Sequence, residues 1–332
     1  MVDAAGALIR SLAGGMVPAV PVPHRADGSF DSAAQDAYAA WMAGQPIAGV
    51  AAWVHTGRGL HLDRETAARV LASWRTALPK GRTLIVGVGA RPRVRGGKRA
   101  RITPPADPQG LTAFVIDASL EMAADAKAAG ADALLVFPPT LLKDLDDRER
   151  RIVQLHKELG EVGLPILAFY LYDAAGGVPY SPRVLDRILA LPHVAGIKVA
   201  TLDSVMTFQD VAERVPPEKL LISGEDRFLG YSLMMGARAA LIGLGAARPS
   251  LSAALVRAHA EGRLADFQKL SLACDRFGAA AFQDPMEGYI RRMLAVLVID
   301  GVIPVEASFD PWGPDVPAHQ LQELEATVKS LS

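Results

Sequence analysis

The apolar run VAGIKVA, residues 194–200, contains a single charged side chain and is the clearest indication of the fold. We predict a strand over residues 194–199, and seven similar runs occur at 16–22, 49–54, 84–88, 133–137, 166–172, 220–223 and 239–244. Runs that are almost continuously apolar are typical of strands buried on both faces, as in a parallel sheet that helices cover. The sequence therefore predicts eight parallel strands.

Longer amphipathic segments separate these runs and are predicted to be helices, at residues 31–44, 64–78, 111–129, 146–160 and 182–191. Asp31 and Ser181 stand where N-caps belong, Pro182 occupies a first helical position, and Gly130 and Gly163 close helices. The repeated strand–helix alternation predicts an α/β fold, a (β/α)8 TIM barrel. A doubly wound open sheet is the alternative, but no Gly-x-Gly-x-x-Gly fingerprint follows the first run.

The chain continues well beyond the eighth run. We predict a barrel with the active site over residues 1–248 and a helical appendage over residues 249–332, with helices at 249–262, 264–280, 286–299 and 317–331. The apolar faces of these helices can pack on the barrel or on a second copy of the chain. Packing on a second copy gives a homo-oligomer; the dimer or tetramer expected for this chain is what the family resemblance described below implies.

Composition restricts the partners and the compartment. The chain has 332 residues, of which 50% are hydrophobic, and a formal net charge of −1, so it offers no global field to hold nucleic acid. One cysteine, Cys274, can form neither an internal disulfide nor a thiolate metal site, which favours the cytoplasm. The N-terminal residues lack the pattern of an export signal, and no apolar run is long enough to span a membrane.

In a barrel enzyme the functional groups lie at the carboxyl ends of the strands. Lys198 sits there among apolar residues, where desolvation lowers the pKa of an amine and frees it to attack a carbonyl; a paired structural lysine is the alternative. Strand alternation sends Tyr170 and Tyr172 to one face, where a phenol either transfers protons or packs in the barrel.

The loop after the second run, AWVHTGRG at residues 52–59, ends in a glycine turn. The Thr56 hydroxyl and the backbone amides beside it could hold a carboxylate. His55 is either a proton-transfer group or a hydrogen-bonded structural residue.

Four motifs together resemble the dihydrodipicolinate synthase and N-acetylneuraminate lyase family, whose members are class I aldolases built on a barrel with C-terminal helices. The motifs are, in chain order, Thr56-Gly57, Tyr170, Gly196-Ile197-Lys198 and Ser223-Gly224-Glu225-Asp226. Tyr170 precedes Lys198 by 28 residues, which is the family separation.

The resemblance implies that Lys198 forms a Schiff base with pyruvate or a related 2-oxo acid while Tyr170 shuttles protons. It also implies that Thr56, with the backbone amides of Thr56 and Gly57, holds the substrate carboxylate. Further substrate contacts are implied for Gly224, Asp226 and Ile242. Neither a metal nor an organic cofactor is implied.

Departures from the family pattern argue against dihydrodipicolinate synthase itself. His55 and Arg58 replace a threonine and a glutamate, so either His55 takes over the proton relay or the relay is absent. Paired tyrosines are missing after Phe137, and Ala175 stands where the synthase has an arginine. Asp226, and less surely Glu225, fall where the lyases contact sugar hydroxyls; capping the next helix is the alternative.

The leading interpretation is therefore a lyase that cleaves, condenses or dehydrates a 2-oxo acid. A binding or regulatory protein for 2-oxo acids, with weak or no turnover, is the alternative. The basic segment from Arg91 to Arg101 either steers an anionic substrate to the barrel or is a solvated loop.

Overall fold

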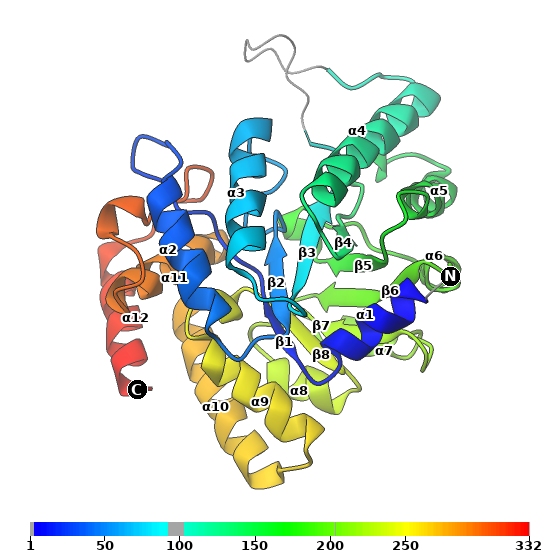
Figure 1. Ribbon diagram of the computed structural model, residues 1–332. Helices are drawn as coiled ribbons and strands as arrows, with labels where there is room; N and C mark the ends of the chain where they lie inside the picture. The colour runs from blue at the N-terminus through cyan, green and yellow to red at the C-terminus, as the bar shows by residue number, and fades with distance from the viewer. Residues whose placement is uncertain (1–2, 92–102, 203, 332) are drawn as a thin grey trace.

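The computed structural model describes residues 3–91, 103–202 and 204–331 (Figure 1). Eight parallel strands pair in the order β1-β8-β7-β6-β5-β4-β3-β2, and a bridge from Ala19 to Ala51 brings β1 and β2 together. The strands are β1 (Met16–Pro18), β2 (Gly49–Ala52), β3 (Thr83–Val88), β4 (Ala133–Val136), β5 (Ile166–Leu171), β6 (Val194–Ala200), β7 (Leu220–Ser223) and β8 (Ala239–Ile242). The predicted (β/α)8 barrel is confirmed.

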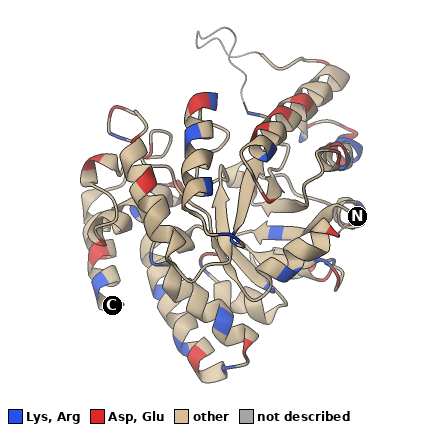
Figure 2. Cartoon of the chain, in the orientation of Figure 1, with Lys and Arg blue, Asp and Glu red and all other residues tan. Residues whose placement is uncertain are grey.

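Helices cover the outside of this barrel (Figure 1). They are α2 (Ser32–Ala43), α3 (Arg64–Ala77), α4 (Pro108–Ala128), α5 (Arg148–Gly160), α6 (Pro182–Leu189), α7 (Val205–Ala212) and α8 (Leu229–Met234). The predicted caps are present, since the Asp31 side chain accepts the N–H of Ala34 and the Ser181 side chain accepts that of Val184. Charged residues lie mostly on these helices and the loops, while the strands carry few (Figure 2).

The barrel wall separates two groups of buried side chains. Inward-pointing residues such as Leu135, Phe169 and Leu241 form the inner cluster, whereas outward-pointing residues such as Val86 and Ile197 pack with the helices in the outer cluster. Successive side chains of a strand alternate between these clusters. A shift of one residue along a strand therefore moves a side chain from the interior to the helical layer.

A helix that the sequence analysis did not identify precedes the barrel. This helix, α1 (Ala4–Leu12), buries Leu8 and Leu12 in the inner cluster, just before the chain enters β1. It therefore closes the end of the barrel at which the strands begin. The opposite end, at the carboxyl ends of the strands, is left for the site.

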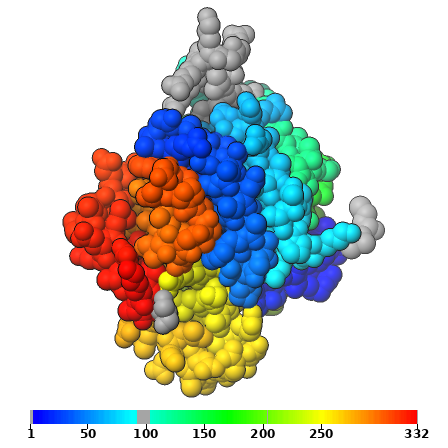
Figure 3. Space-filling view, turned by 60° about the vertical axis from the view of Figure 1, so that its left-hand side comes forward, coloured from blue at the N-terminus to red at the C-terminus, as the bar shows by residue number. Residues whose placement is uncertain are grey.

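Four α-helices follow the barrel: α9 (Pro249–Ala260), α10 (Leu264–Ala281), α11 (Tyr289–Ile299) and α12 (Ala318–Ser330). A short turn, η4 (Met286–Gly288), introduces α11. In the space-filling view this C-terminal segment lies directly against the N-terminal part of the barrel (Figure 3). The backbone pairing of His24 with Phe309 belongs to this contact. Within the described residues, no helix has the length and apolar character needed to cross a membrane.

Candidate active site

Lys198 lies inside the barrel near the carboxyl end of β6. Its neighbours Ile197 and Val199 belong to the outer cluster, so Lys198 points inward, where its side chain is buried. Its Nζ lies 4.4 Å from the centre of the Phe169 ring. A Cβ on Gly224 would approach the Lys198 Cε to 2.6 Å, so only glycine leaves room for the side chain there.

Burial also changes the acidity of the groups around Lys198. Desolvation lowers the pKa of Lys198 toward neutral pH, because an isolated ammonium loses its hydration inside the barrel. The negative charges of Asp226 and Glu225 act in the opposite direction. Desolvation likewise raises the pKa of Asp226, and it raises that of Glu225 to about 7.

The two carboxylates after β7 have different hydrogen-bond partners. Asp226 accepts the backbone N–H of Leu244 through Oδ1, at 2.6 Å. Glu225 accepts the N–H groups of Thr201 and Leu202, at 2.7 and 2.9 Å, and so supports the turn after β6. Neither caps the next helix, α8, whose N-cap is Phe228. The capping alternative is therefore wrong for both, because their side chains turn back to neighbouring strands.

The turn after β2 brings Thr56 into contact with a residue from the C-terminal segment. The Thr56 Oγ1 and the phenol oxygen of Tyr289 are 2.8 Å apart. The N–H of Gly57 donates to the Val54 carbonyl at 3.0 Å, so this amide is committed to the turn. The Gly57 amide is therefore already engaged within the turn, and its predicted contact with the substrate carboxylate, like that of Thr56, stays a prediction.

Tyr289, at the start of α11, connects Thr56 with the lysine side of the barrel. Its ring packs on Gly243, where a Cβ would lie 2.7 Å from the Tyr289 Cε2, and it stacks on Phe282 at 4.6 Å between centroids. The charge of Asp226 acts on its phenol. Burial raises the pKa of Tyr289 well above its usual value. No local motif marks this residue, since it reaches the site from 233 residues beyond Thr56.

Charged side chains meet around Glu287, at the mouth of the site. Glu287 lies 3.0 Å from the His55 Nε2 and 3.1 Å from the Arg58 Nη1, and it accepts the Tyr172 hydroxyl at 3.2 Å. Burial alone would raise its pKa, but hydrogen bonds and charge from His55 and Arg58 hold the pKa of Glu287 at about 2. Arg58 also pairs with Asp310, at 2.7 Å between Nη2 and Oδ2. We call these five residues the mouth cluster.

Residues 112–331 match the model of the dihydrodipicolinate synthetase family, and this match spans more than half of the chain. The chain belongs to that family. The resemblance that its motifs indicated is therefore confirmed, and the protein is a member of a family of lyases and aldolases.

Two curated relatives are similar to this chain in sequence, and two solved structures share its fold. A 4-hydroxy-tetrahydrodipicolinate synthase of Hyphomonas neptunium is 27% identical over 333 residues, covering 96% of this chain and 99% of the relative. A protein named as a probable mitochondrial 4-hydroxy-2-oxoglutarate aldolase, from Emericella nidulans, is 26% identical over 266 residues, 77% of each chain. A dihydrodipicolinate synthase structure from Agrobacterium tumefaciens has a TM-score of 0.79 at 20% identity, covering 98% of this chain and 100% of that one. A sialic acid aldolase from Ruminococcus gnavus has a TM-score of 0.77 at 16% identity, covering 97% and 98%.

The structure of this family member does not bring Tyr170 to Lys198. Tyr170 packs in the outer cluster, with its ring centroid 5.9 Å from that of Tyr180. Between β5 and β6 the register shifts by one residue, so that Lys198 pairs with Phe169 rather than Tyr170. A shift of one residue exchanges the two faces of a strand. The tyrosine that lies 28 residues before Lys198, the family separation, therefore points to the helical layer and not to Lys198.

Ile242 is a second correction. Its side chain is fully buried in the outer cluster, and its carbonyl accepts the N–H of Ala19 at 2.9 Å. Strand alternation therefore turns the Ile242 side chain away from the site, and its carbonyl is engaged with β1, so the structure contradicts the predicted substrate contact of Ile242. The structure thus places Gly224 against the Lys198 side chain and Thr56 beside Tyr289. Asp226 acts on Lys198 through its charge, and the parts of Asp226 and His55 in the reaction stay predictions.

Two further predictions concern the basic segment and metal binding. Of the basic segment 91–101, only Arg91 is among the described residues, and its guanidinium lies 5.0 Å from the centre of the Trp53 ring. Within the described ranges, no three His, Cys, Asp or Glu side chains are arranged to hold a metal.

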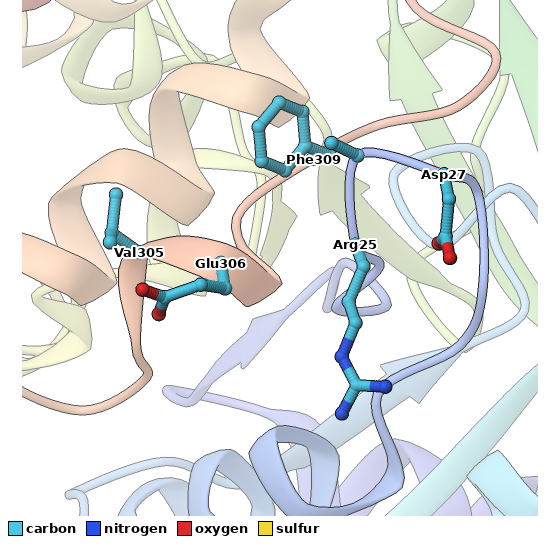
Figure 4. Close-up of a pocket in the computed structure, with 6 residues that line it drawn as sticks. Arg25, Asp27, Val305, Glu306 and Phe309 are labelled. Atoms are coloured by element: carbon cyan, nitrogen blue, oxygen red, sulfur yellow. The ribbon is translucent and has the colours of Figure 1, made fainter.

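A separate pocket of about 480 Å³ lies between the loop after β1 and the C-terminal segment. Its lining contains none of the predicted site residues and consists of Arg25, Ala26, Asp27, Val305, Glu306 and Phe309 (Figure 4).

Proposed function

We propose that this protein is a class I lyase in which Lys198 forms a Schiff base with pyruvate or a related 2-oxo acid. The observation that carries the proposal is a single lysine buried inside the barrel at the carboxyl end of β6, with its pKa lowered by desolvation. The neutral amine adds to the 2-oxo carbon, and the carbinolamine takes up a proton and loses water, which leaves a protonated imine. This imine withdraws electrons during aldol cleavage, condensation or dehydration.

The other residues divide into two groups by position. Thr56, hydrogen-bonded to Tyr289 deep in the site, holds the substrate carboxylate. His55, Tyr172 and Glu287 meet the variable part of the substrate at the mouth. Membership of the family supports the lyase class, because the named relatives include both an aldolase and a synthase.

The proposal is tested by intact-protein mass spectrometry after incubation with pyruvate and borohydride, which reduces an imine to a stable adduct. We expect one reduced pyruvyl group on the native protein and none on Lys198→Ala. Absence of an adduct with pyruvate and with a panel of larger 2-oxo acids would overturn the Schiff-base assignment. An adduct that persists in Lys198→Ala would place the reactive amine elsewhere.

Tyr170→Phe should leave the rate of adduct formation unchanged, because the Tyr170 phenol lies in the helical layer outside the barrel. The measurement is the initial rate of borohydride trapping at several pyruvate concentrations. Tyr289→Phe is the matched comparison, and it should raise the pyruvate concentration that gives half-maximal trapping. A large loss of trapping in Tyr170→Phe alone would show that the phenol reaches the amine.

A second function is favoured by one observation, the Phe169 ring beside Lys198. A phenyl ring cannot transfer protons, so the site is also compatible with a 2-oxo acid binding or regulatory protein of weak turnover. This function predicts a trapped adduct without consumption of pyruvate in the presence of aldehyde acceptors.

A further inference from the structure

Glu287 is the residue on which the mouth cluster converges. It lies in the short turn η4, ahead of α11, and its carboxylate contacts side chains that come from two different strand ends. His55 follows β2, and Tyr172 follows β5. The Glu287 Oε1 lies 3.0 Å from the His55 Nε2 and 3.2 Å from the Tyr172 hydroxyl oxygen. One carboxylate of the C-terminal segment therefore joins two sides of the barrel rim.

These contacts place Glu287 over the opening of the barrel. Strands β3 and β4 lie between β2 and β5, so a carboxylate that reaches a side chain from both β2 and β5 lies across the opening. The Tyr172 side chain packs against the inner cluster. Its backbone N–H donates to the carbonyl of Ala200, which follows Lys198 on β6, at 3.0 Å. The mouth cluster therefore lies above the interior into which Lys198 points.

The contact with Glu287 fixes how the His55 ring is presented. Among the described residues, both hydrogen bonds of His55 are made through Nε2, at 3.0 and 3.1 Å from the two Glu287 oxygens. Glu287 stays ionised, because His55 and Arg58 hold its pKa at about 2. An ionised carboxylate only accepts hydrogen bonds, so Nε2 carries the hydrogen and Nδ1 is the nitrogen that exchanges a proton. A carboxylate that orients an imidazole in this way is typical of a catalytic histidine.

We propose that the His55 Nδ1 transfers the proton of the aldehyde oxygen in the aldol step, with Glu287 as its positioning residue. The inference rests on the proposed function. In cleavage, Nδ1 takes the proton of the substrate hydroxyl, and the O–H electron pair becomes part of the aldehyde C=O bond. The carbon–carbon bond breaks and its electrons form the enamine double bond, while the imine π electrons move to the Lys198 nitrogen. Condensation reverses each movement, so no other reactant is required.

His55 is placed for the aldehyde end of the substrate. It precedes Thr56, which is buried and hydrogen-bonded to Tyr289 at 2.8 Å. The His55 side chain, by contrast, is 19% exposed and stacks on the Tyr289 ring with 6.4 Å between centroids. A 2-oxo acid held by its carboxylate at Thr56 and by its C2 atom at Lys198 therefore directs its remaining atoms past His55 toward solvent.

Tyr172 is the competing group, because it follows β5, packs against the inner cluster and also reaches Glu287. Its hydroxyl donates its one proton to Glu287 at 3.2 Å. Loss of that proton would create a phenolate beside an ionised carboxylate, whereas uptake of a proton by His55 creates a cation that the same carboxylate stabilises. The charge of Glu287 thus favours His55 for the aldehyde oxygen, and separate variants of the two side chains distinguish them.

The experiment compares two parts of the reaction in the same protein. The first part is borohydride trapping with pyruvate, together with exchange of the pyruvate methyl protons in D2O. The second is condensation of pyruvate with a panel of neutral and anionic aldehydes that includes glycolaldehyde and glyoxylate, followed by proton NMR. We expect His55→Gln to keep the first part and to lower kcat for the second by about 10²–10⁴-fold. Glu287→Gln should also keep the first part and lower kcat for the second by about tenfold or more.

The double variant separates a positioning role from a structural one. If Glu287 acts through His55, Glu287→Gln should have little further effect on kcat in the His55→Gln protein. Glu287→Asp keeps the charge and should recover part of the activity that Glu287→Gln loses. Additive losses, or no recovery in Glu287→Asp, would overturn the positioning role. The matched control is Glu306→Gln, an exposed glutamate of the same segment that lines the separate pocket and should condense at the wild-type rate.

The outcomes keep this inference distinct from the proposed function. If wild type gives no trapped adduct, the Schiff-base assignment fails. If it gives the adduct and either consumes none of the aldehydes or condenses equally well as His55→Gln, only the role of His55 fails. Loss of condensation in Tyr172→Phe but not in His55→Gln would assign the step to Tyr172. Should His55→Gln fail to fold, Glu287→Gln decides through the same comparison of trapping with condensation.

Discussion

Lys198→Arg is expected to abolish adduct formation and to lower kcat by about 10⁴-fold or more, the scale seen when an enzyme loses its nucleophile. Arginine keeps the positive charge but does not lose its proton in proteins, so it cannot attack a carbonyl. Lys198→Met removes the charge as well and leaves a side chain of similar length. The measurement is trapping by borohydride together with turnover of a 2-oxo acid substrate. Turnover by both variants would show that Lys198 is not the nucleophile.

The pH dependence of trapping in the native protein provides a further check on Lys198. The attacking form is the neutral amine, whose fraction increases as the pH rises. Because burial lowers the pKa of Lys198, the trapping rate should level off below 10.5, the ordinary lysine value. A rate that continues to rise through pH 10.5 would indicate an exposed lysine as the reactive group.

Arg58→Ala should lower the free energy of unfolding by about 3–5 kcal/mol. Arg58 joins the turn after β2 to the C-terminal segment, through Asp310 at 2.7 Å and Glu287 at 3.1 Å. The Asp310 side chain is only 3% exposed, so without Arg58 its charge stays buried and uncompensated. Urea denaturation of wild type and variant, followed by circular dichroism, measures the difference.

A matched control is available on the surface. Arg214 pairs with Asp186 at 3.2 Å, and both side chains are well exposed. Arg214→Ala should therefore change stability by less than about 1 kcal/mol. Equal effects of Arg58→Ala and Arg214→Ala would contradict a structural role for the Arg58 pairs. The double change of Arg58 and Asp310 to alanine should be less destabilising than the sum of the single changes, because neither charge is then left unpaired.

Most of the barrel could be predicted from the sequence because a parallel strand covered on both faces is a short, almost continuous apolar run. The run at residues 220–223 coincides with β7, and the others begin within one residue of the observed strands. Helix caps were equally recognisable, since Asp31 and Ser181 act through atoms a few residues away. Helix α1 was missed because its apolar stretch carries no signal that it closes the barrel.

The candidate site residues could be predicted from the sequence only where they lie at the end of a strand. Lys198 lies near the end of β6, and Gly224, Asp226 and Thr56 follow their strands within a few residues; barrel geometry brings those ends together. Tyr289 was not predictable, because its contact with Thr56 depends on how α11 packs on the barrel. The partners of Arg58 come from the same segment, so their role also depends on that packing.

The eight strands, the family and the lysine on β6 could all be inferred from the order of the residues. Only the tertiary structure decided which side chains face that lysine. Residue spacing cannot reveal the one-residue register shift between β5 and β6, and this shift pairs Lys198 with the inward-pointing Phe169 instead of the outward-pointing Tyr170. The physical reason is that a strand has a side-chain period of two, so one residue of slip between neighbouring strands exchanges their inner and outer faces.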